Sequence, residues 1–133
     1  IYYFSFVTST TFQDEKTGLQ LPVDDTPLLN KARAKLIATR SGYWLDGKQT
    51  DTLWYENDGV VNTVSMYGPT TGANGPDPII EYDSNDFLIT GQWYWIKIDN
   101  MDHWSVLGHF GSVSKKKRAR KIIFNHINLL KSL

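Results

Sequence analysis

The sequence contains no cysteine and carries no net charge, and these two absences exclude several kinds of function. Without cysteine there is no disulfide, no thiolate metal site and no cysteine nucleophile, while both reducing and oxidising compartments stay compatible. Fourteen Lys and Arg balance fourteen Asp and Glu, so the charge totals do not indicate a nucleic-acid partner. The longest early apolar run, Ile1–Val7, is too short to span a membrane and lacks the basic start and cleavage site of a signal peptide.

The chain also lacks an initial methionine, since it begins with Ile1. We therefore expect a piece of a longer protein, whose export signal, if present, lies upstream. The 133 residues are 41% hydrophobic, which is enough apolar material for a core. We expect residues 1–133 to form one domain or part of one.

Three stretches have the composition of β-strands. Ile1–Val7 is dense in aromatic and β-branched residues, which predicts a buried strand. Residues 92–98 alternate between two sets of side chains and predict a strand that leads into a turn at residues 99–102. Residues 79–82 predict a short edge strand.

Two stretches have helical periodicity. Thr26 precedes Pro27, and apolar residues follow at helical spacing, which predicts a helix over residues 27–39 with Thr26 as its N-cap. Near the end of the chain, apolar residues at 123, 127 and 130, flanked by 122, 129 and 133, form a stripe wide enough to pack on a core. This stripe predicts a terminal amphipathic helix.

The remaining segments are polar or rich in turn residues. Residues 8–25 predict a long loop, residues 41–57 a loop anchored by aromatic side chains, and residues 68–78 a surface turn. The valines at 60, 61 and 64 fit a helical turn or a short strand equally well, because periodicity does not separate the two.

Six of the seven residues from Lys115 to Lys121 are basic. One interpretation is attraction to an anionic surface or a nuclear address. The alternative, which we favour, is the solvated start of a helix, although the helix dipole mildly disfavours cations there.

An acidic turn and a later histidine are the main candidates for chemistry. Asp58 lies in the turn Asn57-Asp58-Gly59, and His103 follows the predicted strand 92–98. A carboxylate on one loop and a histidine on another are the groups with which a hydrolase orients its general base. Taken without any resemblance, Asp58 between Asn57 and Gly59 is better explained as a simple turn former, because Asn-Asp-Gly suits tight turns.

Several blocks of the sequence resemble the C-terminal part of the secreted true lipases of staphylococci and thermophilic bacilli. Their order and approximate spacing match as well. The blocks are Tyr2-Tyr3-Phe4-Ser5-Phe6, Glu56-Asn57-Asp58-Gly59-Val60-Val61-Asn62-Thr63-Val64-Ser65-Met66, Gly68-Pro69 and Asp102-His103. The resemblance implies an α/β fold, namely the C-terminal portion of an α/β-hydrolase with core strands and a terminal amphipathic helix.

The resemblance also implies a Ser, Asp, His triad that hydrolyses acylglycerols and other carboxylic esters at a lipid-water interface, in a secreted protein. In that pattern the acid falls on Asp58 and the histidine on His103. No serine has glycine two positions before and two positions after it, so the Gly-x-Ser-x-Gly nucleophile elbow is absent from the sequence. Because these enzymes order the triad as nucleophile, acid, histidine, we expect the serine upstream of residue 1, in an N-terminal part of the same domain, and the chain alone to be inactive.

Two further histidines compete for the catalytic role. His109 lies in a glycine-rich turn, and His126 lies among apolar residues of the predicted terminal helix, where a structural role is more common. We favour His103, because only this histidine lies in a matching block.

One departure from the family concerns calcium. These lipases commonly hold a structural calcium ion through carboxylates two and seven residues after the catalytic histidine, where this chain has Ser105 and Phe110. Calcium prefers six to eight oxygen ligands with carboxylates among them. We therefore expect no metal site of the usual kind and no cofactor. The family's zinc ligands, where present, belong to the N-terminal part.

A non-catalytic module is the alternative from another class. The chain has five Trp and seven Tyr, and aromatic residues around Trp44, Trp54, Trp93 and Trp95 fit a site for a hydrophobic or sugar ligand. Aromatic side chains at alternate strand positions are more often part of a core.

Overall fold

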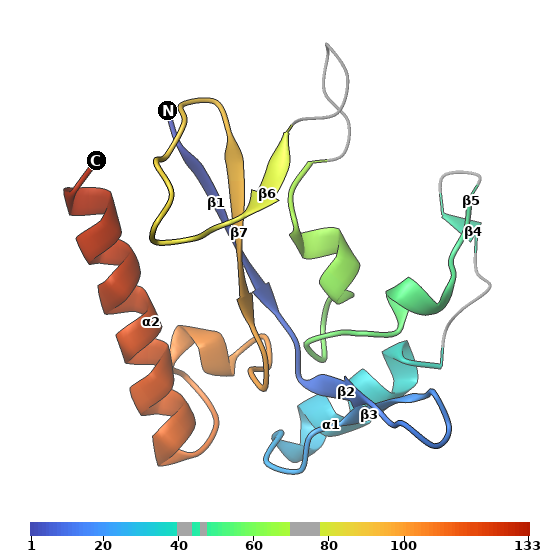
Figure 1. Ribbon diagram of the computed structural model, residues 1–133. Coiled ribbons are helices and arrows are strands. Elements are labelled where there is room, and N and C mark those ends of the chain that lie inside the picture. The colour runs from blue at the N-terminus through green and yellow to red at the C-terminus, as the bar shows by residue number, and fades with distance from the viewer. Residues whose placement is uncertain (40–43, 46–47, 70–77) are drawn as a thin grey trace.

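A parallel three-stranded sheet forms the centre of the computed structural model, which describes residues 1–39, 44–45, 48–69 and 78–133. The order of the strands is β1 (Tyr3–Thr8), β7 (Trp93–Ile98), β6 (Ile79–Glu81). Both neighbours of β7 run parallel to it, with Tyr3 and Ile79 level with Trp93. The carboxyl ends of the three strands therefore lie at one edge of the sheet (Figure 1).

The strand predictions at 1–7, 79–82 and 92–98 are confirmed, with small changes in their bounds. The expected burial of the first strand holds only at its carboxyl end, where Val7 and Thr8 are buried, while Tyr3 is 38% exposed. In the described part of the chain β1 pairs only with β7, so its other edge has no neighbouring strand.

Helix α2 (Val113–Lys131) packs on the sheet (Figure 1), which confirms the predicted terminal helix. Its contact face is centred on Ala119, Ile122 and His126, since Ala119 is buried and the His126 ring lies edge-on to Phe4 at 5.1 Å. The predicted stripe at 123, 127 and 130 lies to one side and is partly exposed. The described chain contains no helix that is long and apolar enough to cross a bilayer.

Helix α1 (Leu28–Ile37) begins one residue later than predicted, because Pro27 is the N-cap and not the first helical residue. The predicted N-cap, Thr26, is wrong: its Oγ1 lies 2.6 Å from Thr10 Oγ1 instead. Because Pro27 occupies the N-cap position, Thr26 lies one residue before it, and its hydroxyl bonds to Thr10 instead of capping the helix.

The predicted long loop at 8–25 is wrong, because it contains the antiparallel pair β2 (Thr11–Gln13) and β3 (Gln20–Pro22). These strands are three residues long, too short to give an alternating pattern. Asp14 closes their turn by accepting hydrogen bonds from Thr17 N and Thr17 Oγ1.

Short elements also occupy parts of the other predicted loops. Strands β4 (Trp44–Leu45) and β5 (Lys48–Gln49) pair antiparallel, and a 3-10 helix covers Thr52–Trp54. The undecided valine segment resolves into a bend followed by a 3-10 helix at Thr63–Met66. Most of the predicted turn at 68–78 lies outside the described residues.

The core lies where β1 and β7 meet the loops and the two helices that pack against them. Its buried apolar side chains come from both strands, both helices and the loop after β7. They are Val7, Ala34, Ala38, Tyr94, Ile98, Met101 and Ala119. Most of the buried polar residues also lie at the carboxyl edge of the sheet, in or beside the loops that follow the strands.

Candidate active site

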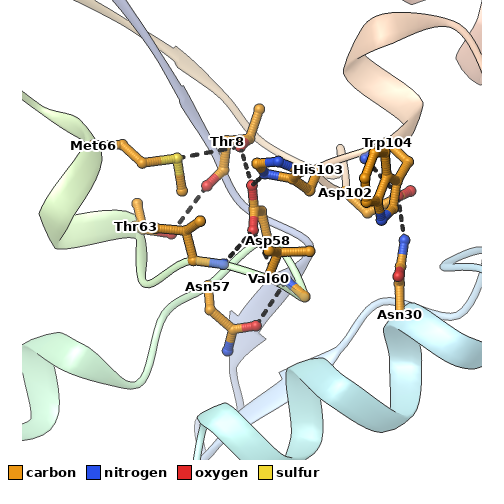
Figure 2. A network of polar contacts seen from close by, with 12 residues as sticks. Thr8, Asn30, Asn57, Asp58, Val60, Thr63, Met66, Asp102, His103 and Trp104 are labelled. Carbon is orange, nitrogen blue, oxygen red and sulfur yellow. Dashed lines mark hydrogen bonds and ion pairs between the residues drawn. The ribbon is translucent and has the colours of Figure 1, made fainter.

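Asp58 and His103 meet at the carboxyl edge of the sheet, although they come from different loops. His103 Nδ1 lies 2.9 Å from Asp58 Oδ2, and the backbone N–H of His103 donates to the Asp58 carbonyl at 3.0 Å (Figure 2). The histidine loop is thus joined to the acid loop twice, through a side chain and through the backbone. This double contact fixes both the position and the direction of the imidazole.

The carboxylate of Asp58 is fully buried and has hydrogen-bond partners at both oxygens. Its Oδ1 accepts from the backbone N–H groups of Val60 and Val61 at 3.0 and 2.8 Å. Its Oδ2 accepts from Thr8 Oγ1 at 2.8 Å and faces His103. A buried carboxylate without donors is costly, so these contacts make a charged acid compatible with full burial.

Thr8, at the end of β1, supports the acid from the sheet. Its hydroxyl has one proton and two acceptors within reach, Asp58 Oδ2 at 2.8 Å and Met66 Sδ at 3.4 Å. A carboxylate is a much stronger acceptor than a thioether. The Thr8 carbonyl in turn accepts from Thr63 Oγ1 at 3.0 Å, which closes the loop around Asp58.

The acid loop is held against α1 by its flanking residues. Asn57 is fully buried, and its Nδ2 donates to the carbonyl of Ala34 at 3.0 Å while its Oδ1 accepts from Gly59 N at 2.9 Å. Gly59 has φ +89°, and a Cβ there would lie 3.1 Å from the carbonyl oxygen of Asn30. Glycine at position 59 is therefore required by both the positive φ of the turn and the close approach of the helix.

The ion pair between Lys97 and Glu56 holds the start of the same loop to β7, with Nζ and Oε1 2.6 Å apart. Partial burial works to lower the pKa of Lys97, but the hydrogen bond and the negative charge of Glu56 outweigh it and raise that pKa. The acid loop is thus anchored to β1, to β7 and to α1.

The His103 side chain is 37% exposed, in contrast to Asp58. Because an ionised Asp58 only accepts hydrogen bonds, it favours the neutral tautomer with the proton on Nδ1, which leaves Nε2 as a base. His103 also lines a largely apolar hollow of about 270 Å³ with Phe6, Met66, Val106 and Leu107. The arrangement is chemically suited to accept a proton from a group placed beside this hollow.

The competing histidines lie elsewhere. His109 is exposed, and no hydrogen bond or ion pair joins it to another described residue. His126 lies on α2 between the rings of Phe4 and Phe6, and burial lowers its pKa. Among the described histidines, only His103 contacts a carboxylate.

The two positions at which the family commonly has calcium ligands differ in their surroundings. Ser105 is fully buried and donates its Oγ to Asp102, whereas Phe110 is 58% exposed. The described residues contain no group of three or more His, Cys, Asp or Glu side chains able to hold a metal ion. The loss of the usual calcium site remains a prediction from the sequence.

Sequence reasoning missed the residues that support the pair. Thr63 and Asn57 lie inside the matching block, so the block itself carried a signal for them. Thr8 and Asn30 lie far from Asp58 and Asp102 along the chain, and single polar residues at a strand end or on a helix carry no recognisable pattern.

The proposed aromatic binding module finds little support in the packing of its tryptophans. Trp93 stacks on Tyr3 with ring centroids 5.1 Å apart and donates to Ser5 Oγ at 2.5 Å. Trp95 packs edge-on against Tyr67 at 4.8 Å. Both rings thus pack against a neighbouring tyrosine within the fold, and the side chain of Trp44 lies outside the described part.

No protein-family model matches the sequence, but the fold is similar to several solved structures. EstA from Clostridium botulinum matches 90% of this chain with 30% identity and a TM-score of 0.70. A Staphylococcus hyicus lipase matches 100% of it with 20% identity and a TM-score of 0.66, and lipase 1 from Pelosinus fermentans matches 92% with 28% identity and a TM-score of 0.58.

The matched region is 28%, 33% and 32% of those three chains, so this chain spans about a third of the length of its relatives. The predicted fold class is confirmed by these matches and by the mixed sheet and helices. Over most of its length the chain is similar to solved bacterial lipases and an esterase, and it has the fold of the C-terminal portion of an α/β-hydrolase.

Proposed function

We propose that this chain contributes the acid and the histidine of a Ser, Asp, His triad in a carboxylic ester hydrolase, with Asp58 and His103 in these roles. The observation that carries the proposal is the 2.9 Å contact between a fully buried carboxylate and a partly exposed imidazole. The relationship to bacterial lipases and esterases supports the same chemistry.

In the proposed reaction His103 Nε2 takes the proton of the serine hydroxyl as the serine oxygen attacks the ester carbonyl. The resulting imidazolium, stabilised by Asp58, then gives this proton to the leaving alcohol, and an acyl-enzyme remains. In the second half of the reaction water attacks the acyl-enzyme and gives a proton to His103. The bond between the acyl group and the serine then breaks, His103 returns the proton to the serine, and the carboxylic acid is released. The serine and the oxyanion hole belong to other parts of the protein.

In the described part of the chain one edge of β1 has no neighbouring strand, and this supports the proposal that an N-terminal part of the same domain completes this site. Thr8, at the end of β1, contacts Asp58 directly, so a strand added parallel to β1 would bring its own carboxyl end to the triad. Brought there, a nucleophile elbow lies close to the apolar hollow beside His103. We propose that residues 1–133 alone are inactive for this reason.

The proposed substrates are acylglycerols and other esters at a lipid-water interface, and the proposed location is extracellular. Exposed apolar side chains near the histidine loop suit such an interface. Leu29, Trp104 and Phe110 line one apolar groove of about 360 Å³, and all three are partly exposed.

The test is ester hydrolysis by the longer protein and its single variants. Asp58→Asn and His103→Ala are each expected to lower kcat by about 10⁴ with the fold intact, as loss of the orienting acid does in the well-studied triad. His109→Ala, an exposed histidine nearby in sequence, serves as the control with normal activity. Near-normal turnover in a folded Asp58 or His103 variant refutes the assignment.

The activity of the isolated chain separately tests the proposal that the serine of the triad lies outside residues 1–133. Purified residues 1–133 are expected to show no ester hydrolysis above buffer. Hydrolysis that disappears in His103→Ala refutes the proposal that the nucleophile lies elsewhere.

A further inference from the structure

The residue before His103 is a second fully buried carboxylate. Asp102 Oδ1 accepts from Asn30 Nδ2 at 2.6 Å and from the backbone N–H groups of Trp104 and Ser105 at 3.2 Å each, and Ser105 Oγ donates to Oδ2. No Lys or Arg of the described residues lies within ion-pair distance of it. Four neutral donors, three of them within its own loop, therefore surround this charge.

The fourth donor comes from another element, helix α1. Asn30 is 3% exposed in the first turn of this helix, and asparagine has lower helix propensity than alanine or leucine. Burial of a side-chain amide is unfavourable without hydrogen-bond partners. The contact with Asp102 accounts for an asparagine at this buried position, and it joins segments 72 residues apart (Figure 2).

Asn30 also touches the acid loop. A Cβ on Gly59 would lie 3.1 Å from the Asn30 carbonyl oxygen and 3.2 Å from its Cβ, so the backbone of the acid loop lies directly against this residue. One turn further along α1, the carbonyl of Ala34 accepts from Asn57. Helix α1 is thus a common support for the loops that carry Asp58 and His103.

We propose that Asn30, Asp102 and Ser105 are positioning residues for His103. They hold the histidine loop against α1, so that the loop cannot move relative to Asp58 without breaking buried hydrogen bonds. Ser105 is included because its hydroxyl binds the second oxygen of Asp102, which sets the orientation of the carboxylate toward Asn30. The inference rests on the function proposed above, since it concerns the same histidine.

The expected effect follows from the geometry of proton transfer. Loss of the Asn30 amide frees the loop by a fraction of an ångström to an ångström, and a displacement of about 1 Å costs on the order of 10²-fold in rate. Asn30→Ala in the longer protein is therefore expected to lower kcat for a soluble ester by about 10-fold to 100-fold, with KM within about 2-fold. Ser105→Ala, which keeps the Asn30 contact, is expected to give the same pattern with a smaller loss.

Thr26→Val is the matched control, because Thr26 is 5% exposed and its buried hydroxyl contacts Thr10 and is bonded to neither Asp58 nor His103. It is expected to lose stability without loss of kcat. The proton on His103 Nδ1 gives a second readout, because its NMR signal lies far downfield when it is held by a carboxylate. This signal is expected to move upfield or broaden in Asn30→Ala and to stay unchanged in Thr26→Val.

A double variant separates positioning from general destabilisation. In a His103→Ala background, Asn30→Ala should leave the residual rate unchanged, because there is no imidazole to position. Wild-type kcat and an unchanged His103 signal in Asn30→Ala, or equal losses in the two backgrounds, overturn the inference. If Asn30→Ala does not fold, Ser105→Ala decides by the same criteria. Normal activity of His103→Ala itself instead overturns the proposed function.

Discussion

At the scale of single residues, the burial of Asp58 depends on its hydrogen-bond donors. Thr8 Oγ1 is the donor that reaches Asp58 Oδ2 from the sheet, at 2.8 Å. Thr8→Val keeps the shape of the side chain and removes this donor, so a buried carboxylate oxygen loses a partner. We expect a loss of about 1–3 kcal/mol in the free energy of unfolding, measured by urea denaturation.

Thr8→Ser is the control for this change, because serine keeps the hydroxyl and loses only a methyl group. It is expected to retain most of the stability that valine loses. A valine variant as stable as the wild type contradicts the role of Thr8 as a donor to Asp58.

Gly59 allows a second prediction at this scale. Gly59 and Gly91 have nearly the same positive φ, +89° and +85°, but of the two only a Cβ at Gly59 would meet a neighbour, Asn30. Gly91→Ala is expected to cost about 1 kcal/mol through strain alone, and Gly59→Ala to cost 1 kcal/mol or more beyond that, about as much as a forced backbone shift. Thermal or urea unfolding measures both, and equal losses contradict the close packing of the acid loop on α1.

Sequence reasoning found Asp58 and His103 because a contiguous block of residues surrounds the acid and a short one contains the histidine. It named Asp102 only as part of the matching block and did not find Asn30 or the contact between the two, because a contact between residues 72 apart leaves no local pattern. Buried polar pairs of this kind depend on tertiary structure, and no propensity indicates them.

At the scale of secondary-structure elements, long periodic segments were predictable and short ones were not. The strand at Trp93–Ile98 and the helix at Val113–Lys131 follow from alternation and from an apolar stripe. The hairpin of β2 and β3 was missed, since three-residue strands made largely of polar residues are stabilised by pairing and by their turn. The contact face of α2 was displaced from the predicted stripe because His126, a polar residue, lies at its centre.

The six basic residues at the start of α2 divide into two groups. Lys115 is buried and pairs with Asp25 at 3.0 Å, and Arg118 donates to the carbonyl of Asp99 at 2.6 Å. Arg118 and the other four basic residues are exposed. Lys115 is packed at the helix start and Arg118 is bonded at the surface, which favours a structural interpretation of part of the run.

His126 predicts a pH dependence that belongs to α2. Burial lowers its pKa, and its Nδ1 has no hydrogen-bond partner in the described structure. The unfolded chain then binds a proton more readily than the folded one, so stability falls as pH falls through about 6.5. Urea unfolding from about pH 7.5 to about pH 5 is expected to show this loss.

His126→Phe is expected to reduce this pH dependence, since the phenyl ring fills the same space between Phe4 and Phe6 without titrating. His109→Gln, at an exposed site, is expected to leave it unchanged. An identical slope in His126→Phe and wild type contradicts the assignment to His126.

At the scale of the whole molecule, composition alone did not indicate the function. Neutral charge, no cysteine and a moderate apolar fraction fit many domains, and the resemblance came from short blocks in the right order. Acyl-chain preference and an oxyanion hole for the proposed hydrolase were not predictable, because no stretch of this sequence is recognisable as a nucleophile elbow or as an acyl-binding segment.

The expected loss of calcium binding is tested on the longer protein. Ser105 and Phe110 supply no carboxylate, and the Ser105 hydroxyl is bonded to Asp102. A ligand that binds only the folded state raises the melting temperature, so we expect neither excess calcium nor a chelator to change Tm. A clear rise in Tm with calcium that magnesium does not reproduce contradicts this expectation.

The central claim is that Asp58 and His103 act as one unit in ester hydrolysis. The most direct measurement is kcat/KM for a soluble ester in the longer protein with Asp58→Asn, His103→Ala and both together, each shown to be folded. Residues that act as a unit are strongly non-additive, so the double variant is predicted to be no slower than His103→Ala alone. Losses that multiply, or full activity in either single variant, contradict the account.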